Sequence, residues 1–320
     1  MEKSAIKLRT IFMGTSEFAA EILEALVNAG YNIVSVYTQP DKKAGRDQEV
    51  KSSAVKIFSE KNKINVHQPE KLDGATVKEI ADQRPDIIIL AAYGKIIPKT
   101  ILDIPGFGAL NIHTSLLPKY RGPSPIQNSL LNGEKETGVT VILMDEKIDT
   151  GDILSHKPTE IGKDENAAEL SKKLAKVASE LLLETLPLWV ERKITPQKQD
   201  DSKATLCQLI EKADGKIVWS DDAESIYNRY RAFTPWPGIF TFWEKGDSLK
   251  RLKLNKIGLM KINPEIKHHA GEVFQLGEKI GVQAGTGVII LDEIQLEGKS
   301  SVSIDEFVNG YPDFLGSVLK

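Results

Sequence analysis

The sequence predicts an α/β domain with an open, mostly parallel sheet, followed by a smaller all-β domain. Through the first two-thirds of the chain, apolar β-rich segments alternate with segments of helical periodicity, the pattern of a sheet covered by helices. Beyond residue 208, short segments of alternating polarity are separated by Gly, Asn and Lys turns, which is typical of a small OB-like barrel. We expect a first domain over residues 1–194, a linker over 195–207 and a second domain over 208–320.

Each element of the first domain follows from its local pattern. An apolar strand over residues 8–14 leads into a helix, with Ser16 as the expected N-cap and Gly30 as the C-terminal stop. Further strands are expected at 31–39, 86–94, 109–115 and 138–145, with helices at 52–63 and 165–190. The loop "MGTSEF" has Gly14 alone where a dinucleotide-binding fold would carry several glycines, so we expect a tight turn and no nucleotide cofactor.

The second domain is predicted from five short segments and one aromatic motif. The segments cover residues 238–243, 251–259, 270–277, 279–285 and 287–296. In "RAFTPWPG", we expect Phe233 and Trp236 to be core residues at the junction of the domains rather than platforms for stacking bases.

Composition restricts the class of protein. The formal net charge of −3 predicts no broad attraction to nucleic acid, although a local basic patch remains possible. Cys207 is the only cysteine, so neither an intrachain disulfide nor a cysteine-based metal site is expected. The opening residues lack the long apolar run of a signal peptide, and no apolar stretch is long enough to cross a bilayer. We therefore expect a cytoplasmic protein.

An amide and an imidazole stand on one face of a predicted buried strand. In "ALNIH", Leu110 and Ile112 point to one side of the sheet, whereas Asn111 and His113 point to the other. Buried polar groups without partners are costly, so we expect this pair beyond the carboxyl ends of the strands, where an open α/β sheet forms its binding crevice. The alternative is a structural Asn and His, each bonded to backbone.

Two loops predict the surroundings of this pair. The segment "TSLLPKYRGPSP" contains three prolines that oppose regular pairing, as in a wall of a binding site. The turn "MDEKIDTGD" supplies Asp145, Asp149 and Asp152, any of which could orient His113. For Asp145 and Asp152, the favoured alternative is turn formation and capping.

These residues carry a resemblance to a known family. "NIHTSLLPKYRGPSPIQ" and "MDEKIDTGDIL" resemble the signatures N-[IV]-H-x-S-L-L-P-x-x-R-G and D-[TA]-G-x-I of the 10-formyltetrahydrofolate-dependent formyltransferases. With "FMGTSEFAA", "TQPDKKAGR", "AAYGKIIPK" and "RAFTPWPG", the resemblance covers nearly the whole chain and is greatest to members that formylate methionyl-tRNA. It implies a Rossmann-like catalytic domain and an OB-like tRNA-binding domain. We expect the protein to be a monomer.

The resemblance also implies roles for individual residues. Asn111, His113 and Asp149 are the implied catalytic residues. The implied lining of the tetrahydrofolate site is Ser115, Leu116, Leu117 and Pro118, with backbone around Ala92–Tyr93 and Leu143–Asp149 holding the pterin. The Leu117–Pro118 bond is expected to be cis. The chemistry implied is attack of the α-amino group of methionyl-initiator tRNA on the formyl carbon of 10-formyltetrahydrofolate, without a metal.

Nucleic-acid contacts are expected from two regions. Arg46 lies in a loop implied to enter the tRNA acceptor end, but Asp47, Gln48 and Glu49 follow it where related enzymes tend to carry basic residues. Residues 244–267 contain seven Lys or Arg and three Asp or Glu, which predicts a basic stripe through Lys250, Lys256 and their neighbours. Thr114 stands where the family more often has Gly or Ala, and we expect this difference to change packing only. The alternatives are a formyltransferase acting on an amino-sugar nucleotide and a folate- or RNA-binding protein without turnover.

Overall fold

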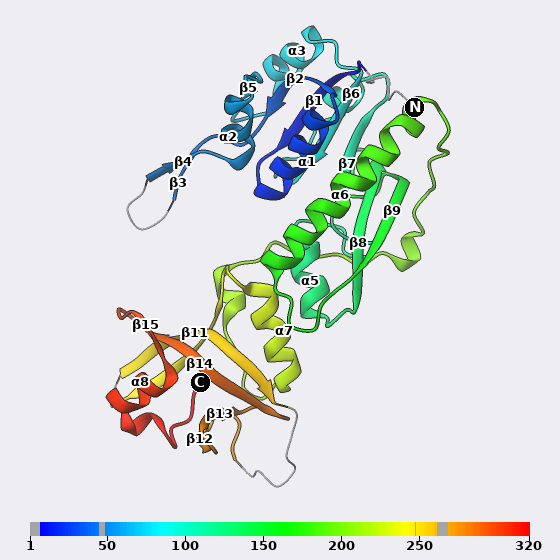
Figure 1. Ribbon diagram of the computed structural model, residues 1–320. Coiled ribbons are helices and arrows are strands. Elements are labelled where there is room, and N and C mark those ends of the chain that lie inside the picture. Colours follow the sequence, from blue (N-terminus) through cyan, green and yellow to red (C-terminus); the bar gives the residue numbers. More distant parts are fainter. Residues whose placement is uncertain (1–6, 45–48, 247, 261–267) are drawn as a thin grey trace. The chain divides into compact units, whose positions relative to one another are not determined.

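The computed structural model describes residues 7–44, 49–246, 248–260 and 268–320 (Figure 1). Its contacts divide the chain into two compact units. The first unit comprises Met1–Pro125, Lys135–Ile161 and Leu170–Gln208; the second comprises Ile126–Glu134, Gly162–Glu169 and Leu209–Lys320. The second unit therefore includes two short segments that precede the predicted linker.

The first unit contains a seven-stranded sheet of order β5-β2-β1-β6-β7-β8-β9. The strands are β1 (Arg9–Gly14), β2 (Asn32–Tyr37), β5 (Val66–His67), β6 (Ile87–Ala91), β7 (Ala109–His113), β8 (Glu136–Leu143) and β9 (Asp152–Glu160). The first five pair in parallel, and β8 and β9 add two antiparallel strands at one edge. The predicted mostly parallel α/β sheet is confirmed.

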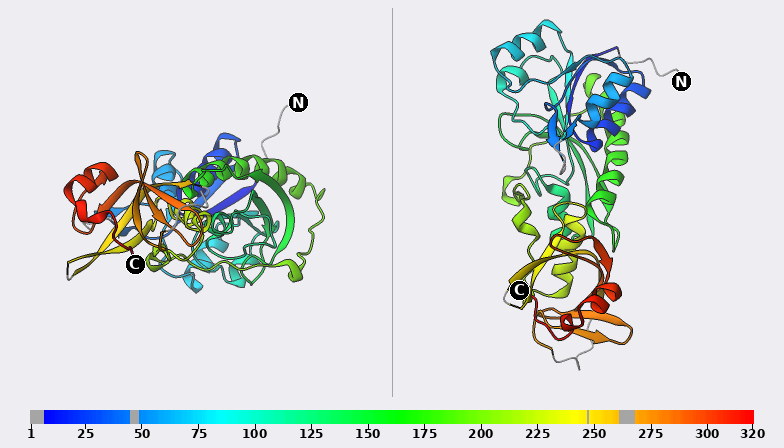
Figure 2. Two further views of the ribbon diagram at one scale, coloured as in Figure 1. Left: turned by 90° about the horizontal axis from the view of Figure 1, so that it is seen from below. Right: turned by 90° about the vertical axis from the view of Figure 1, so that its left-hand side faces the viewer.

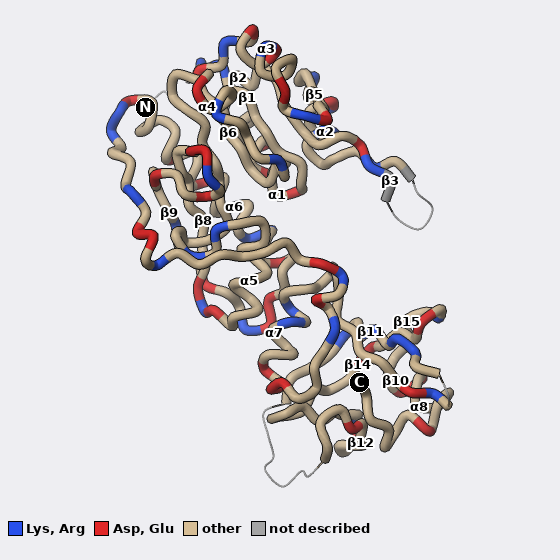
Figure 3. The backbone as a smooth tube through the Cα atoms, turned by 180° about the vertical axis from the view of Figure 1, so that it is seen from behind, with Lys and Arg blue, Asp and Glu red and all other residues tan. Residues whose placement is uncertain are grey.

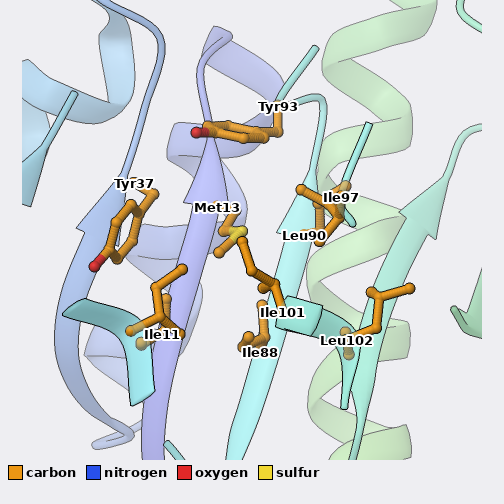
Figure 4. Close-up of a cluster of buried hydrophobic side chains, with 11 residues drawn as sticks. Ile11, Met13, Tyr37, Ile88, Leu90, Tyr93, Ile97, Ile101 and Leu102 are labelled. Atoms are coloured by element: carbon orange, nitrogen blue, oxygen red, sulfur yellow. The ribbon is translucent and has the colours of Figure 1, made fainter. Parts of the chain in front are cut away.

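Helices cover both faces of this sheet. They are α1 (Glu17–Asn28), α2 (Ala54–Lys61), α3 (Gly74–Asp82), α4 (Lys99–Leu102) and α6 (Ala167–Val190). Figures 1 and 2 show α1 and α6 on one face. On the other face, side chains of β1 and β6 pack with Ile80 of α3 and Ile101 of α4 (Figure 4). Ser16 caps α1 by accepting a hydrogen bond from the Ala19 amide, as predicted.

A small hairpin lies outside the sheet. Its antiparallel strands are β3 (Lys42–Ala44) and β4 (Glu49–Lys51). Asp41, just before β3, accepts hydrogen bonds from the side chains of Lys56 and Gln68, and these contacts lower the pKa of its carboxyl group. Arg46 and the two residues after it lie outside the described part of the chain.

The second unit is built on an antiparallel sheet, which confirms the predicted all-β character. Its strands are β10 (Ile239–Lys245), β11 (Ser248–Met260), β12 (Val273–Leu276), β13 (Lys279–Gln283), β14 (Val288–Leu296) and β15 (Ser301–Ser303). Two helices, α7 (Ala223–Phe233) and α8 (Ile304–Gly310), were not predicted, and most of α5 (Pro125–Leu131) clusters with this unit. The ring of Trp243 makes edge contacts with Phe307 and Phe314 in its core.

The two aromatic residues of "RAFTPWPG" have different environments. Phe233, the last residue of α7, is 1% exposed, as expected of a core residue. Trp236 is 53% exposed, so the expectation that it belongs to the core is wrong. It lies in the turn between α7 and β10, beyond the buried face of either element.

None of the described helices is both long and apolar enough to span a bilayer.

Candidate active site

Strand β7 positions the amide and the imidazole singled out in the sequence. Asn111 and His113 are 8% and 5% exposed, and His113 pairs across the strands with Thr140 of β8. Leu110 and Ile112 are buried on the opposite face, as the strand period requires. The two polar side chains are therefore held next to each other by a rigid central strand.

Asp149 approaches them from the loop between β8 and β9. This loop starts beside the beginning of β7, where the Met144 amide donates to the Ala109 carbonyl at 2.8 Å. Because β8 is antiparallel to β7, the loop leaves the sheet at the amino end of β7. It then folds back along the strand, and Asp149 reaches Asn111. Asn111 pairs with Leu90, the next-to-last residue of β6, and His113 is the last residue of β7, so the group lies at the carboxyl ends of the parallel strands, as expected.

The side chains of Asn111, His113 and Asp149 converge, as the family resemblance implies. Asn111 Nδ2 donates to Asp149 Oδ1 at 3.1 Å, and His113 Nδ1 lies 3.5 Å from Asp149 Oδ2. The Gly122 amide donates to the same Oδ2 at 2.8 Å. Asp149 thus accepts hydrogen bonds on both oxygens, one from β7 and one from the loop that contains Gly122, which fixes its carboxylate in one orientation.

The second nitrogen of His113 also faces an oxygen. His113 Nε2 lies 2.9 Å from the carbonyl oxygen of Tyr120. An imidazolium donates to both of these acceptors, whereas a neutral ring donates to one of them. The surroundings of His113 therefore accommodate a positively charged ring next to the Asn111 amide.

The other two aspartates of the turn have different places. Asp145 accepts hydrogen bonds from the Lys147 amide and the Thr150 hydroxyl, which is the turn-forming alternative considered for it. Asp152 is the first residue of β9 and pairs with Leu143. Of the three aspartates, the structure brings Asp149 to the pair on β7.

The segment after β7 is folded on itself around Thr140. Ser115 Oγ donates to the Lys119 carbonyl, Thr140 Oγ1 donates to the Ser115 carbonyl, and the Leu117 amide donates to Thr140 Oγ1. The Leu117–Pro118 bond is cis, as expected. Ser115 and Leu117 are buried, whereas Leu116 and Pro118 keep part of their surface. A ligand against this segment would meet backbone together with those half-buried side chains.

Burial raises the pKa of two groups in the first unit. Tyr93 is 1% exposed with its hydroxyl unpartnered among the described residues, and burial raises its pKa to about 12. Burial also raises the pKa of the Cys207 thiol, whose Sγ lies 3.4 Å from the Ser124 amide. Both groups are therefore neutral near pH 7.

Sequence reasoning missed three residues around this group. Gly122 holds the Asp149 carboxylate through its amide, and Gln199 reaches the backbone of Asp149 from the predicted linker. Arg121, which is 7% exposed, bonds the Gln199 side chain. The pair R-G inside the first signature was a signal for Arg121 and Gly122. Gln199 stands in a polar segment without periodicity, which offers no local signal.

Figure 3 marks the Lys and Arg residues of the second unit, and the cross-strand pairs divide those of the expected basic stripe between the two faces of β11. Arg251 pairs across strands with Phe242, and its guanidinium carbon lies 3.7 Å from the centroid of the Phe240 ring. The preceding residue, Lys250, pairs with the buried Trp243 and so belongs to the opposite face. Lys253 pairs with Phe240 and shares the face of Arg251, so these two cations lie together on that face without Lys250.

Three further lysines belong to the expected basic stripe. Lys256 is exposed on β11, next to irregular pairing with β14. Lys261 and Lys267 lie outside the described residues.

Among the residues that the structure describes, no three or more His, Cys, Asp or Glu side chains are grouped so that they could hold a metal ion.

Comparisons with known proteins extend over both units. Residues 7–186 match the family model "Formyl transferase", and residues 209–312 match "Formyl transferase, C-terminal domain". A methionyl-tRNA formyltransferase of Caldicellulosiruptor saccharolyticus is 44% identical, with 97% of this chain and 99% of that protein covered. The methionyl-tRNA formyltransferase of Campylobacter curvus is 46% identical, with 95% and 97% covered.

Solved structures show the same fold at much lower identity. An N-formyltransferase from Helicobacter canadensis, in complex with folinic acid and dTDP-3-aminofucose, has a TM-score of 0.66 at 19% identity, covering 89% of this chain and 98% of that one. HypX from Aquifex aeolicus, in complex with tetrahydrofolic acid, has a TM-score of 0.62 at 16% identity, covering 96% and 48%. The two family models and the full-length relatives show that the chain belongs to the formyl transferase family, among the methionyl-tRNA formyltransferases.

Proposed function

We propose that this enzyme transfers the formyl group of 10-formyltetrahydrofolate to the α-amino group of methionyl-initiator tRNA, as a cytoplasmic monomer. The observation that carries the proposal is the convergence of Asn111, His113 and Asp149 over β7. Amine attack on a formyl carbon needs donors for the developing oxyanion and a route for one proton, and these side-chain types supply both.

In this proposal, Asn111 binds the formyl oxygen. Its amide nitrogen has two N–H groups, and one of them donates to Asp149 Oδ1. The second is left for an oxygen of the substrate. Because Asp149 holds the amide in place, the donor needs no reorientation when negative charge develops on that oxygen.

His113 and Asp149 act together in the proton transfer. Asp149 faces Nδ1 and fixes the plane of the ring, so Nε2 is the nitrogen that exchanges its Tyr120 partner for substrate. The neutral ring takes a proton from the attacking amine on Nε2, directly or by way of one water, as the new C–N bond forms. The resulting imidazolium stabilises the oxyanion next to it and then gives the proton to N10 of the folate as the bond between N10 and the formyl carbon breaks.

The remaining assignments of the proposal concern binding. The segment Ser115, Leu116, Leu117 and Pro118 lines the folate site, with its backbone held by Thr140. Arg46 contacts the acceptor end of the tRNA. Residues 1–194 form the catalytic domain, 195–207 the linker and 208–320 the tRNA-binding domain, boundaries that lie close to the two family matches.

One assay separates this function from its alternatives. The purified protein is given 10-formyltetrahydrofolate with either methionyl-initiator tRNA or an amino-sugar nucleotide, and the formylated product is measured by mass spectrometry. We expect formylation of the tRNA alone. Formylation of the sugar nucleotide alone would identify the other transferase, and folate binding without any product would identify a binding protein.

A matched pair of variants ties the result to the site. Asn111→Ala should lose formylation, because the donor for the formyl oxygen is removed. The control is Asn132→Ala, since Asn132 is exposed and its amide donates to the Asn128 carbonyl one helical turn earlier. Equal activity of both variants would contradict the assignment of Asn111.

A further inference from the structure

Gln199 joins the two ends of the tight turn that presents Asp149. Its Nε2 donates to the Asp149 carbonyl at 2.9 Å and to the Gly151 carbonyl at 2.8 Å. Asp149 has φ +54°, a left-handed conformation that residues with a side chain rarely adopt. At Gly151 an added Cβ would lie 1.9 Å from the Leu143 carbonyl oxygen. The turn is therefore tight and locally disfavoured, and the Gln199 amide bonds both sides of it.

Arg121 determines which way the Gln199 amide points. Its Nε and Nη2 donate to Gln199 Oε1 at 3.0 and 2.8 Å, and Nη2 also donates to Asp201 Oδ1 at 2.7 Å. A guanidinium has donors only, so it requires the amide oxygen on its side. The amide nitrogen is then left facing the two carbonyls of the turn.

Residues next to Arg121 in the chain also contact Asp149. Gly122, the residue after Arg121, donates its amide to Asp149 Oδ2 at 2.8 Å. The Arg121 backbone is held in turn by the linker: its amide donates to the Thr205 carbonyl, and its carbonyl accepts from the Cys207 amide, both at 2.8 Å. The Gly122 amide therefore holds the Asp149 carboxylate, and the Gln199 side chain holds the Asp149 backbone.

We propose that Gln199 is a positioning residue for the formyl-transfer reaction, with Arg121 as its anchor. It holds the turn in the conformation that aims the Asp149 carboxylate at Asn111 and His113. The predicted linker is therefore structurally part of the active site, although it lies about fifty residues after the turn. This inference rests on the proposed function, because the reaction it serves is formyl transfer.

The first test uses two substitutions of nearly the same size. Gln199→Glu keeps an acceptor for Arg121 but puts an oxygen against two carbonyls, and Gln199→Met removes both kinds of hydrogen bond. Each should lower kcat ~10- to 100-fold, with KM for both substrates within twofold, because misplacement of a catalytic group affects the chemical step. The controls are Gln197→Glu and Gln197→Met; Gln197 is exposed and bonds Ile153 through its backbone.

A second readout needs no substrate. The ¹⁵N resonances of the His113 ring, identified by their loss in His113→Ala, report on the contact between Nδ1 and Asp149. They should shift in both Gln199 variants at fixed pH and stay unchanged in both Gln197 variants. If the unsubstituted protein formylates no methionyl-tRNA, the proposed function is wrong, and these resonances still decide the role of Gln199.

Two outcomes would overturn the inference. One is an unchanged His113 spectrum, with kcat within twofold of the unsubstituted enzyme, in both Gln199 variants. The other is a fall in kcat that matches the loss of folded protein measured by circular dichroism, because Gln199 would then serve stability alone.

Discussion

Replacing Asp149 by asparagine changes one oxygen into an amide nitrogen while almost conserving volume. In the protein, Oδ1 accepts from Asn111, whereas Oδ2 accepts from the Gly122 amide and faces His113 Nδ1. An asparagine side chain has only one oxygen, so it can accept a hydrogen bond from Asn111 or from the Gly122 amide but not from both. Whichever way it turns, its NH₂ group opposes either the Asn111 amide nitrogen or the Gly122 amide, and the charge that attracts an imidazolium is gone.

The size of the effect follows from these contacts. A hydrogen bond to a charged acceptor contributes ~1.5–3 kcal/mol, and loss of one aligned donor for an oxyanion costs ~2.7–4 kcal/mol in the transition state. The second value applies if Asn111 is released, since Asn111 is the proposed donor. At about 1.4 kcal/mol for each factor of ten, Asp149→Asn should lower kcat ~10²- to 10³-fold.

The assay is formylation of methionyl-initiator tRNA at saturating 10-formyltetrahydrofolate, with kcat and both KM values measured. Asp152→Asn is the matched control, because Asp152 lies three residues away at the start of β9 and opposite Leu143. We expect the control to retain kcat and Asp149→Asn to keep both KM values. A kcat for Asp149→Asn within fivefold of the unsubstituted enzyme would refute the reasoning.

Four further predictions concern other residues. His113→Ala should lower kcat by ~10² or more, since a general acid–base group is lost, while calorimetry still detects folate binding; near-normal turnover would disprove its role. Gly122→Ala should destabilise the fold by at least ~2 kcal/mol in urea unfolding, because φ is +122° and the new Cβ would lie 2.3 Å from the Cys207 carbonyl oxygen; an unchanged midpoint would contradict this. Arg46→Ala should raise KM for tRNA and weaken its salt dependence, with KM for folate unchanged; equal changes in both KM values would argue against a tRNA contact. Because burial raises the pKa of the Cys207 thiol, less thiolate is present than in a free cysteine at pH 8, so a disulfide reagent should label the native enzyme slowly and the unfolded chain rapidly; equal rates would show that the thiol is accessible.

Much of the fold could be predicted from local sequence patterns. Side-chain alternation placed Asn111 and His113 on one face of β7, and helical periodicity with Ser16 located α1. These patterns depend on the geometry of a strand or helix, which a few neighbouring residues determine. Trp236 shows the limit of this reasoning, because its exposure depends on where the buried faces of α7 and β10 end.

The arrangement of the site was decided by contacts between distant segments. The residues alone left three aspartates as partners for His113, and the family resemblance pointed to Asp149. The fold brings Asp149 there because β8 runs antiparallel to β7 and its loop returns across the strand. Gln199 reaches the same turn from fifty residues away, bonded to Arg121. Strand direction and such long-range hydrogen bonds have no local periodicity. Local patterns therefore indicated Asn111 and His113, and only the fold shows which distant residues hold them.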